Sequence, residues 1–463
     1  MKTKLFLILI TACFFSDSVS AALKLDSSGK NPNFLYEYDP KALASTIQFI
    51  VRTGSVNDPK TKQGLVNFSF LSLLRGTKEK SRAEFLKAVE TIGASIDTNT
   101  GYTHTDISLN VISENLEQSI HLLAEAVLKP ALRKAELESL RDELMAKLQQ
   151  EKSNNRMLLR RAYRLALYKD SSLAFPPNGT ILGVKESSLD DVNNTLSTYL
   201  KSKNILIAVT SNQKEEVVKN WLEQSFQNLA EGDAPIASYP ERKKVGGRKL
   251  YIVSRKGSST TEMNIGHYGI SADHPLRDEI DAGMFIFGSN FNSRLMRVLR
   301  KENGWTYGAY AYFQINDIGK KNEGLFAMYS FPQKEFSLKA AAKAVEMYED
   351  YVKNGITKKE LLFAKNSMSN SYPFQFANAK ARMGAKLAQA LDGAPFLSVP
   401  AYQKKIRNLN GKKIHTAIKK VHDPKNLIFV AVGDEDQLKD LAKTIPGITE
   451  VKVIHETMSD KEF

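Results

Sequence analysis

Apolar and polar positions divide the chain into short segments of strand-like and helix-like spacing. Residues 44–52 alternate as a strand, with Ile47, Phe49 and Val51 on one side. Residues 93–97 and 105–111 predict a hairpin of two further strands. Apolar residues at helical spacing predict helices over residues 64–74, 82–91, 116–128 and 134–168, of which the first is almost wholly apolar and the last is long and polar. This mixture of elements indicates an α+β protein.

A strand-and-helix pattern occurs twice, near the end of each half of the chain. Residues 203–212 and residues 425–434 both contain an uninterrupted apolar strand, and each is followed by an amphipathic helix. The repeat predicts two similar α+β domains rather than one large fold. The polar, Pro-containing segment between the halves is typical of a linker. We therefore divide the chain into a leader (residues 1–21), an N-terminal domain (22–237), a linker (238–248) and a C-terminal domain (249–463).

The first 21 residues have the features of a secretory signal. Lys2 and Lys4 precede an apolar stretch, and small residues precede a cut after Ala21. This favours a periplasmic or secreted protein. The alternative is a lipoprotein cut that leaves Cys13, the only cysteine, lipidated at the new N-terminus. With the first cut, the mature chain has no thiol nucleophile and no thiolate metal site.

Composition narrows the partners that we expect. The net charge is +14, yet the basic residues stand among acidic ones, as in Arg141-Asp142-Glu143, which is typical of solvated helix faces. No nucleic-acid-binding motif accompanies the basic residues, so no nucleic-acid partner is expected. The chain after the leader has no apolar run of about 18 residues, so no transmembrane segment is expected.

One stretch of the second half could bring two polar side chains together. Residues 292–302 predict a helix, Asn303-Gly304 predicts a turn, and Tyr307 begins an aromatic strand. Arg300 and Tyr307 lie on either side of that turn and could point into the same space. Spacing alone also fits a structural interpretation, in which Tyr307 is a half-buried strand residue and Arg300 a solvated cation at a helix end.

A second stretch, residues 64–77, carries a resemblance to a known family. It is similar to the zinc box of the pitrilysin/insulinase type of metallopeptidase, the group that also contains the mitochondrial processing peptidase. That box is a Gly, a small apolar pair, His-x-x-Glu-His, an apolar tail and Gly-Thr. Its two His share one helix face and bind zinc, and its Glu is the general base. Here Asn67 and Leu71 stand at the His positions and Phe70 at the Glu position.

The resemblance predicts no catalytic zinc in this chain. The family's third ligand, a Glu further along, falls near Ala146 and Lys147, with Glu143 and Glu151 close by. The seven histidines show no paired ligand spacing, and we interpret each as a surface or satisfied histidine. The apolar residues 64–77 could also be merely a core helix.

Several further motifs keep the family's order and spacing, so the resemblance covers about residues 40–440. They include Gly54-Ser55, the segment Gly266–Ile270, and Ser-Arg-Leu followed by Arg-x-x-x-Gly-x-x-Tyr-Gly. The family's domains are α+β, with helices packed on one side of a mostly antiparallel sheet. The resemblance implies that Arg300 and Tyr307 contact substrate near the scissile peptide.

The resemblance also implies how such a chain works. Some family members divide the site between two chains, one with the zinc box and one with the Arg/Tyr pair. We therefore expect a non-catalytic subunit with no cofactor and no peptidase activity of its own, acting on peptides with a homologous partner that holds the zinc. The alternative is a non-enzymatic peptide-binding or assembly scaffold, possible as a homodimer.

Overall fold

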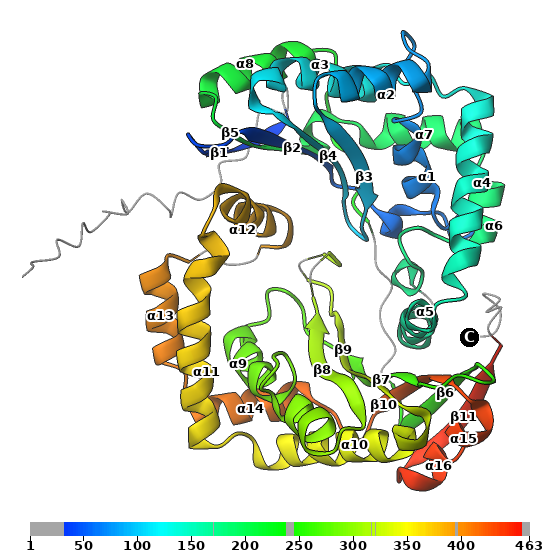
Figure 1. Ribbon diagram of the computed structural model, residues 1–463, viewed down its shortest axis with the longest axis vertical. Coiled ribbons are helices and arrows are strands. Elements are labelled where there is room, and N and C mark those ends of the chain that lie inside the picture. Colours follow the sequence, from blue (N-terminus) through cyan, green and yellow to red (C-terminus); the bar gives the residue numbers. More distant parts are fainter. Residues whose placement is uncertain are drawn as a thin grey trace, which may run out of the picture.

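The computed structural model describes residues 32–169, 171–237, 245–315, 317–319, 321–393 and 397–455. The predicted leader, with Cys13, and most of the predicted linker lie outside these residues. The described chain forms two sheets, one in each half, with helices on both faces of each sheet (Figure 1).

The N-terminal sheet has five strands in the order β1-β5-β2-β4-β3. Only the β1–β5 pair is parallel. The strands are β1 (Asn33–Tyr38), β2 (Ala44–Val51), β3 (Ser95–Thr100), β4 (Thr105–Ile112) and β5 (Ile205–Ser211). The helices of this half are α1 (Leu65–Ser72), α2 (Arg82–Thr91), α3 (Leu116–Leu128), α4 (Lys134–Glu151), α5 (Asn155–Tyr168), α6 (Ile181–Glu186), α7 (Leu189–Tyr199) and α8 (Glu215–Ser225).

The C-terminal sheet has six strands in the order β11-β6-β10-β7-β9-β8. The pairs β11–β6 and β6–β10 are parallel and the others antiparallel. The strands are β6 (Arg248–Ser254), β7 (Glu262–Tyr268), β8 (Thr306–Gln314), β9 (Leu325–Pro332), β10 (Leu427–Gly433) and β11 (Ile448–Ile454). The helices are α9 (Arg277–Phe287), a π-helix (Met296–Glu302), α10 (Ser337–Asn354), α11 (Lys358–Ser371), α12 (Ala379–Asp392), α13 (Val399–Arg407), α14 (Gly411–Val421), α15 (Glu435–Leu438) and α16 (Leu441–Thr444).

The two halves repeat one plan, which confirms the predicted α+β fold with two similar domains. The order β1-β5-β2-β4-β3 corresponds to β6-β10-β7-β9-β8, with β11 added at one edge. The repeated strands β5 and β10 occupy equivalent places, each parallel to the first strand of its half and antiparallel to the second. The sequence repeat is therefore a repeat of topology.

The predicted helix over residues 134–168 is two helices, and the second covers the other domain. The chain turns at residues 152–154, and the Asn154 side chain accepts the N–H groups of Arg156 and Met157 to begin α5. Helix α5 then packs on β6, β7 and β10 (Figure 1). In return, α12 packs on β1 and β5, and Glu37 of β1 forms ion pairs with Arg382 and Lys386.

Each half thus covers one face of the other half's sheet with a helix, α5 or α12. This exchange of helices explains why β5 and β10 are apolar at every position instead of alternating. Their odd-numbered residues face the helices of their own half, and their even-numbered residues face the helix from the other half. A strand covered on both faces has no solvent side, so alternation disappears. The exchange also depends on Gly266 of β7, where a Cβ atom would lie 2.0 Å from the Phe326 carbonyl oxygen and 2.5 Å from the Tyr163 hydroxyl of α5.

No helix within the described residues is long and apolar enough to cross a membrane.

Candidate functional site

Helix α1 contains the three box positions, and its surroundings are those of a core helix. The Asp58 carboxylate accepts the N–H groups of Gly64 at 2.7 Å and Val66 at 2.8 Å, which satisfies donors at the helix N-terminus. Phe70 is fully buried, and Leu71 packs against the same apolar cluster from its edge. Asn67 is also buried and offers one amide. Two hydrocarbon side chains and one amide cannot replace two imidazoles and a carboxylate.

The carboxylates nearest to the predicted third-ligand position are engaged elsewhere. Glu143 accepts two hydrogen bonds from the Arg75 guanidinium, at 2.8 and 2.5 Å, and Arg75 lowers the pKa of Glu143 to about 2. Both carboxylate oxygens of Glu151 accept the Asn178 amide at 2.9 Å. Across the described ranges, no three His, Cys, Asp or Glu side chains gather to hold a metal ion. The side chains of the box therefore do not fit zinc.

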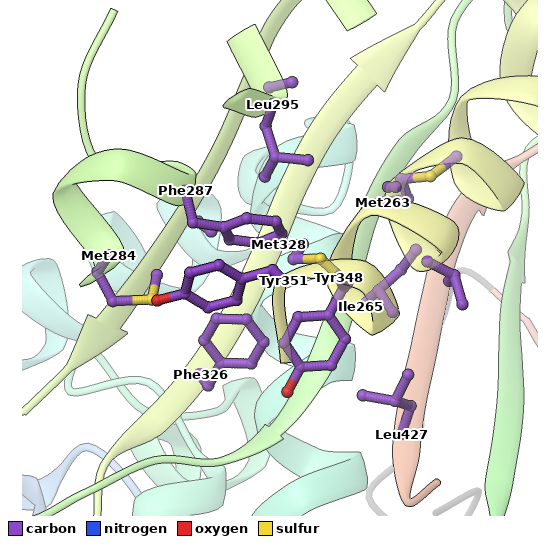
Figure 2. Packing of buried hydrophobic residues seen from close by; sticks show 14 of the residues in the cluster. Met263, Ile265, Met284, Phe287, Leu295, Phe326, Met328, Tyr348, Tyr351 and Leu427 are labelled. Carbon is purple, nitrogen blue, oxygen red and sulfur yellow. The ribbon is translucent and has the colours of Figure 1, made fainter. Parts of the chain in front are cut away.

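Arg300 lies on the π-helix Met296–Glu302, where the helical hydrogen bonds are lengthened by one residue. The N–H of Asn303, for example, donates to the carbonyl of Val298. Leu295, Met296 and Leu299 anchor this helix in the C-terminal core. Figure 2 shows Leu295 pointing toward Phe287, whose ring stacks on that of Tyr351. Short π-helical segments occur frequently at functional sites, and they orient side chains differently from a regular α-helix.

Tyr307 lies in a β-bulge at the start of β8. Thr306 pairs with Pro332 and Ala309 with Ser330, so β8 has one residue more than β9 over this interval. The extra residue changes the alternation, and both Tyr307 and Tyr310 face solvent although they are three positions apart. Tyr307 is 76% exposed, so it is not the half-buried strand residue that the structural interpretation of the sequence required.

The turn brings Arg300 and Tyr307 into contact on the surface. The guanidinium carbon of Arg300 lies 4.6 Å from the centre of the Tyr307 ring and 4.7 Å from that of Phe291, which is also exposed. The preceding arginines of this stretch differ: Arg294 pairs with Glu360 and Arg297 with Glu302. Within the described chain, Arg300 forms no ion pair. A guanidinium without a carboxylate partner, beside an exposed phenol, can donate hydrogen bonds to a bound carbonyl.

Phe291 is the member of this cluster that sequence reasoning missed. It precedes the predicted helix, and only its large apolar side chain in a polar turn, Ser289-Asn290-Phe291-Asn292, could have indicated it. The segment Gly266–Ile270, in contrast, has a structural role. The Tyr268 hydroxyl donates to the carbonyl of Leu167 in α5, and Gly269 packs closely on Leu325.

The buried histidines of the C-terminal domain form a network rather than a metal site. His267 Nε2 lies 2.7 Å from the Tyr348 hydroxyl, which lies 3.1 Å from His422 Nδ1. Burial lowers the pKa of both histidines, so both are neutral near pH 7. His104 instead contacts Asp317 of the other half at 3.2 Å. Each of the three has at least one polar partner, although the buried Nε2 of His422 has none among the described residues.

Comparison with known proteins places these features in a family. The profile described as insulinase (peptidase family M16) matches residues 33–176, and that described as peptidase M16 inactive domain matches residues 187–368. A relative from Helicobacter pylori named "Non-peptidase homolog YmxG" is 21% identical, over 94% of this chain and 100% of its own. A Bacillus subtilis relative named "Uncharacterized zinc protease YmxG" is 20% identical over 75% of this chain and 83% of its own.

A solved structure has the same fold. The crystal structure of a peptidase M16 inactive domain from Pseudomonas fluorescens superposes with a TM-score of 0.79 at 20% identity, covering 88% of this chain and 96% of that one. The two profiles together account for more than half of the chain, in the order expected for the two domains. The chain thus belongs to peptidase family M16, and the positions of the family's zinc box lie in a helix of its N-terminal core.

Proposed function

We propose that this chain is the non-catalytic subunit of a two-chain zinc peptidase, in which Arg300 and Tyr307 bind the peptide that the partner cleaves. One observation carries the proposal. The zinc-box positions lie in a core helix, whereas the half-buried Arg300 and the exposed Tyr307 are in contact, and within the described residues Arg300 forms no ion pair with a carboxylate. The name of the Helicobacter pylori relative, a non-peptidase homolog, supports the non-catalytic part.

The chemistry of the pair suits a supporting role in peptide hydrolysis. Zinc bound by a partner's His-x-x-Glu-His box would activate the water. The Arg300 guanidinium and the Tyr307 hydroxyl would donate to the peptide carbonyl and to the oxyanion that develops on it. The ring of Phe291 holds the guanidinium from a second side, so less freedom is lost when Arg300 binds a peptide.

Reconstitution from separate chains tests this proposal. This chain and a homologous chain from the same host with an intact box are purified apart, and peptidase activity is measured for each and for the mixture. We expect activity only in the mixture, complete at equal amounts of the two chains and abolished by a zinc chelator. Full activity of the partner alone, unchanged by this chain, would contradict the proposal.

The second candidate function is a peptide-binding or assembly scaffold without catalysis, in the form of a homodimer. A basic cavity lined by arginines of helix α5, within the single chain, favours this function. A homodimer that binds peptides and ignores every homologous chain would establish it instead.

We also propose that the chain is exported by its leader. Fractionation of the native host should find the protein outside the cytoplasm. A Cys13→Ala variant distinguishes the two routes, since it would detach a lipoprotein from the membrane fraction and leave a secreted or periplasmic protein where it was.

A further inference from the structure

A second surface that could bind a ligand lies where the two halves meet. A cavity of about 660 Å³ opens between the end of α4, the exposed side of α5, residues 176–179 and the strands β7, β8 and β9. Tyr102, from the turn between β3 and β4, also lines it. This volume is within the range of small-molecule and short-peptide sites. Arg300 and Tyr307 do not line it; Tyr307 stands five residues from the cavity residue Tyr312 on β8, roughly 16 Å along the strand.

The cavity has an unbalanced positive charge. Helix α5 contains four arginines and no acidic residue. Arg156, Arg160 and Arg164 recur every four positions and therefore share one face of the helix, which lines the cavity. Within the described ranges, none of these three forms an ion pair. Two acids lie nearby, Glu151 and Glu262, and they accept hydrogen bonds from the neutral Asn178 and Tyr329 side chains. They offset only part of the positive charge, because one Lys and four Arg line the cavity with Glu151 as the single acid among its lining residues.

The inner end of this arginine stripe is buried and incompletely bonded. Arg164 is 6% exposed and stacks 4.0 Å from the centre of the Tyr102 ring. Its Nε donates to the carbonyl of Leu173 and its Nη1 to Gln314 Oε1, but its Nη2 has no hydrogen-bond partner among the residues that the structure describes. Asn264, 2% exposed, also lines the cavity, and its Oδ1 has no partner. Buried polar atoms without partners are costly, so such atoms in a cavity point to a ligand.

The two unpartnered atoms, Arg164 Nη2 and Asn264 Oδ1, require opposite hydrogen-bonding groups on a ligand. Arg164 offers a donor on a planar cation, which matches a carboxylate or phosphate oxygen. Asn264 offers an acceptor, which requires an N–H or O–H. A peptide supplies both within one residue, a carboxylate and a backbone N–H, whereas an inorganic phosphate supplies mainly acceptors. Arg156 and Arg160, exposed at the outer end of the stripe, would attract the anion before it reaches Arg164.

We infer that this cavity binds the carboxylate of a short peptide, with Arg164 at its inner end and Arg156 and Arg160 at its mouth. The carboxylate is either the C-terminal group of the peptide or the side chain of an Asp or Glu. The site is separate from Arg300 and Tyr307, lies within one chain and needs no partner subunit. Its failure in a test would therefore leave the proposed two-chain peptidase untouched.

The test is calorimetric titration of the isolated chain with four acetylated hexapeptides of one alanine-rich sequence. They carry Glu or Gln at the fifth position and a free or amidated C-terminus. We expect at least one of the three peptides with a carboxylate to bind, no binding of the peptide with Gln and an amide, and weaker binding as salt rises. Binding that requires the free C-terminus identifies the terminal carboxylate, and binding that requires Glu identifies the side chain. Equal binding of the neutral peptide, or binding of inorganic phosphate but of no peptide, would overturn the inference.

Variants locate the binding. The double variant Arg156→Gln/Arg160→Gln changes exposed residues and should fold, yet should weaken binding about tenfold or more. Arg164→Lys keeps the charge but loses the planar fork, and should weaken it by a similar factor. The matched control Arg82→Gln/Arg297→Gln removes two surface charges elsewhere and should bind as the unchanged chain does. If the two double variants bind alike, the cavity is not the site.

Discussion

Helix α1 contains the zinc-box positions, and the segment from Phe291 to Tyr307 contains the proposed peptide-binding pair; the two regions differ in structure. At the first, the two ligand positions hold the buried Asn67 and the edge residue Leu71, and the general-base position holds the buried Phe70. At the second, Arg300 and Tyr307 lie at the surface on a π-helix and a β-bulge. Irregular backbone is maintained only where the surrounding structure supports it. The proposed peptide-binding role of Arg300 and Tyr307 accounts for this contrast between a regular core helix and an irregular segment at the surface.

The largest expected effect concerns stability at the box. Phe70→Glu places a carboxylate in a fully buried position and leaves part of the ring volume empty. We expect a loss of more than about 4 kcal/mol in the free energy of unfolding, measured by urea denaturation. Tyr307→Glu, at an exposed position, should change it by no more than about 0.5 kcal/mol. Equal losses of stability in the two variants would contradict the assignment of Phe70 to the core and of Tyr307 to the surface.

The next effect concerns the helix exchange that holds both regions in one molecule. Gly266→Ala forces a methyl group against Phe326 and Tyr163 and should cost about 1–3 kcal/mol of stability. Gly384→Ala provides the control, because Gly384 lies in α12 with open space around it and alanine favours a helix. That variant should be more stable than the parent chain by about 0.5–1 kcal/mol. A neutral Gly266→Ala would mean that α5 can move away from β7 without loss.

The smallest effect is a pH dependence between the halves. Burial acts to lower the pKa of His104, but the hydrogen bond and the negative charge of Asp317 outweigh it, so the pKa is raised above the usual 6.5. A raised histidine pKa adds stability that is complete below the unfolded pKa and lost as pH rises through the folded pKa. We expect His104→Gln to cost about 1 kcal/mol at pH 5.5 and less at pH 8.5. The same cost at both values would show that the charge on His104 contributes nothing.

Local patterns predicted most of the fold, and long-range contacts account for the rest. The strand β2 and helices α2 and α3 follow from spacing, because each has one face toward its own core. The break at residues 152–154 has only weak sequence signals, since what separates α5 from α4 is its packing on the other domain's sheet. The closeness of Arg300 to Tyr307 follows from the turn at Gly304, whose φ is +65°. The bulge that exposes Tyr307 depends on pairing with β9 and could not be predicted.

The basic cavity could not be predicted from the overall charge pattern, because that pattern conceals a local cluster of arginines. Most basic residues stand among acidic ones, so the charge pattern of the whole chain indicates solvated helix faces. Arg156, Arg160 and Arg164, spaced by four without an acid between them, are the local exception and were visible in the sequence. What the sequence could not supply is that the three arginines line one cavity together with the buried Asn264, which comes from a strand of the other domain.

One kinetic comparison tests the central claim most directly. In the reconstituted two-chain enzyme, kcat/KM is measured with Arg300→Ala and, as its control, with Arg297→Ala from the same helix; Tyr307→Phe and Tyr310→Phe form a second matched pair. If Arg300 and Tyr307 bind the reacting peptide, their variants should form the complex normally and lose about a hundredfold or more in kcat/KM, while both controls keep nearly full activity. Full activity with Arg300→Ala and Tyr307→Phe would contradict the account.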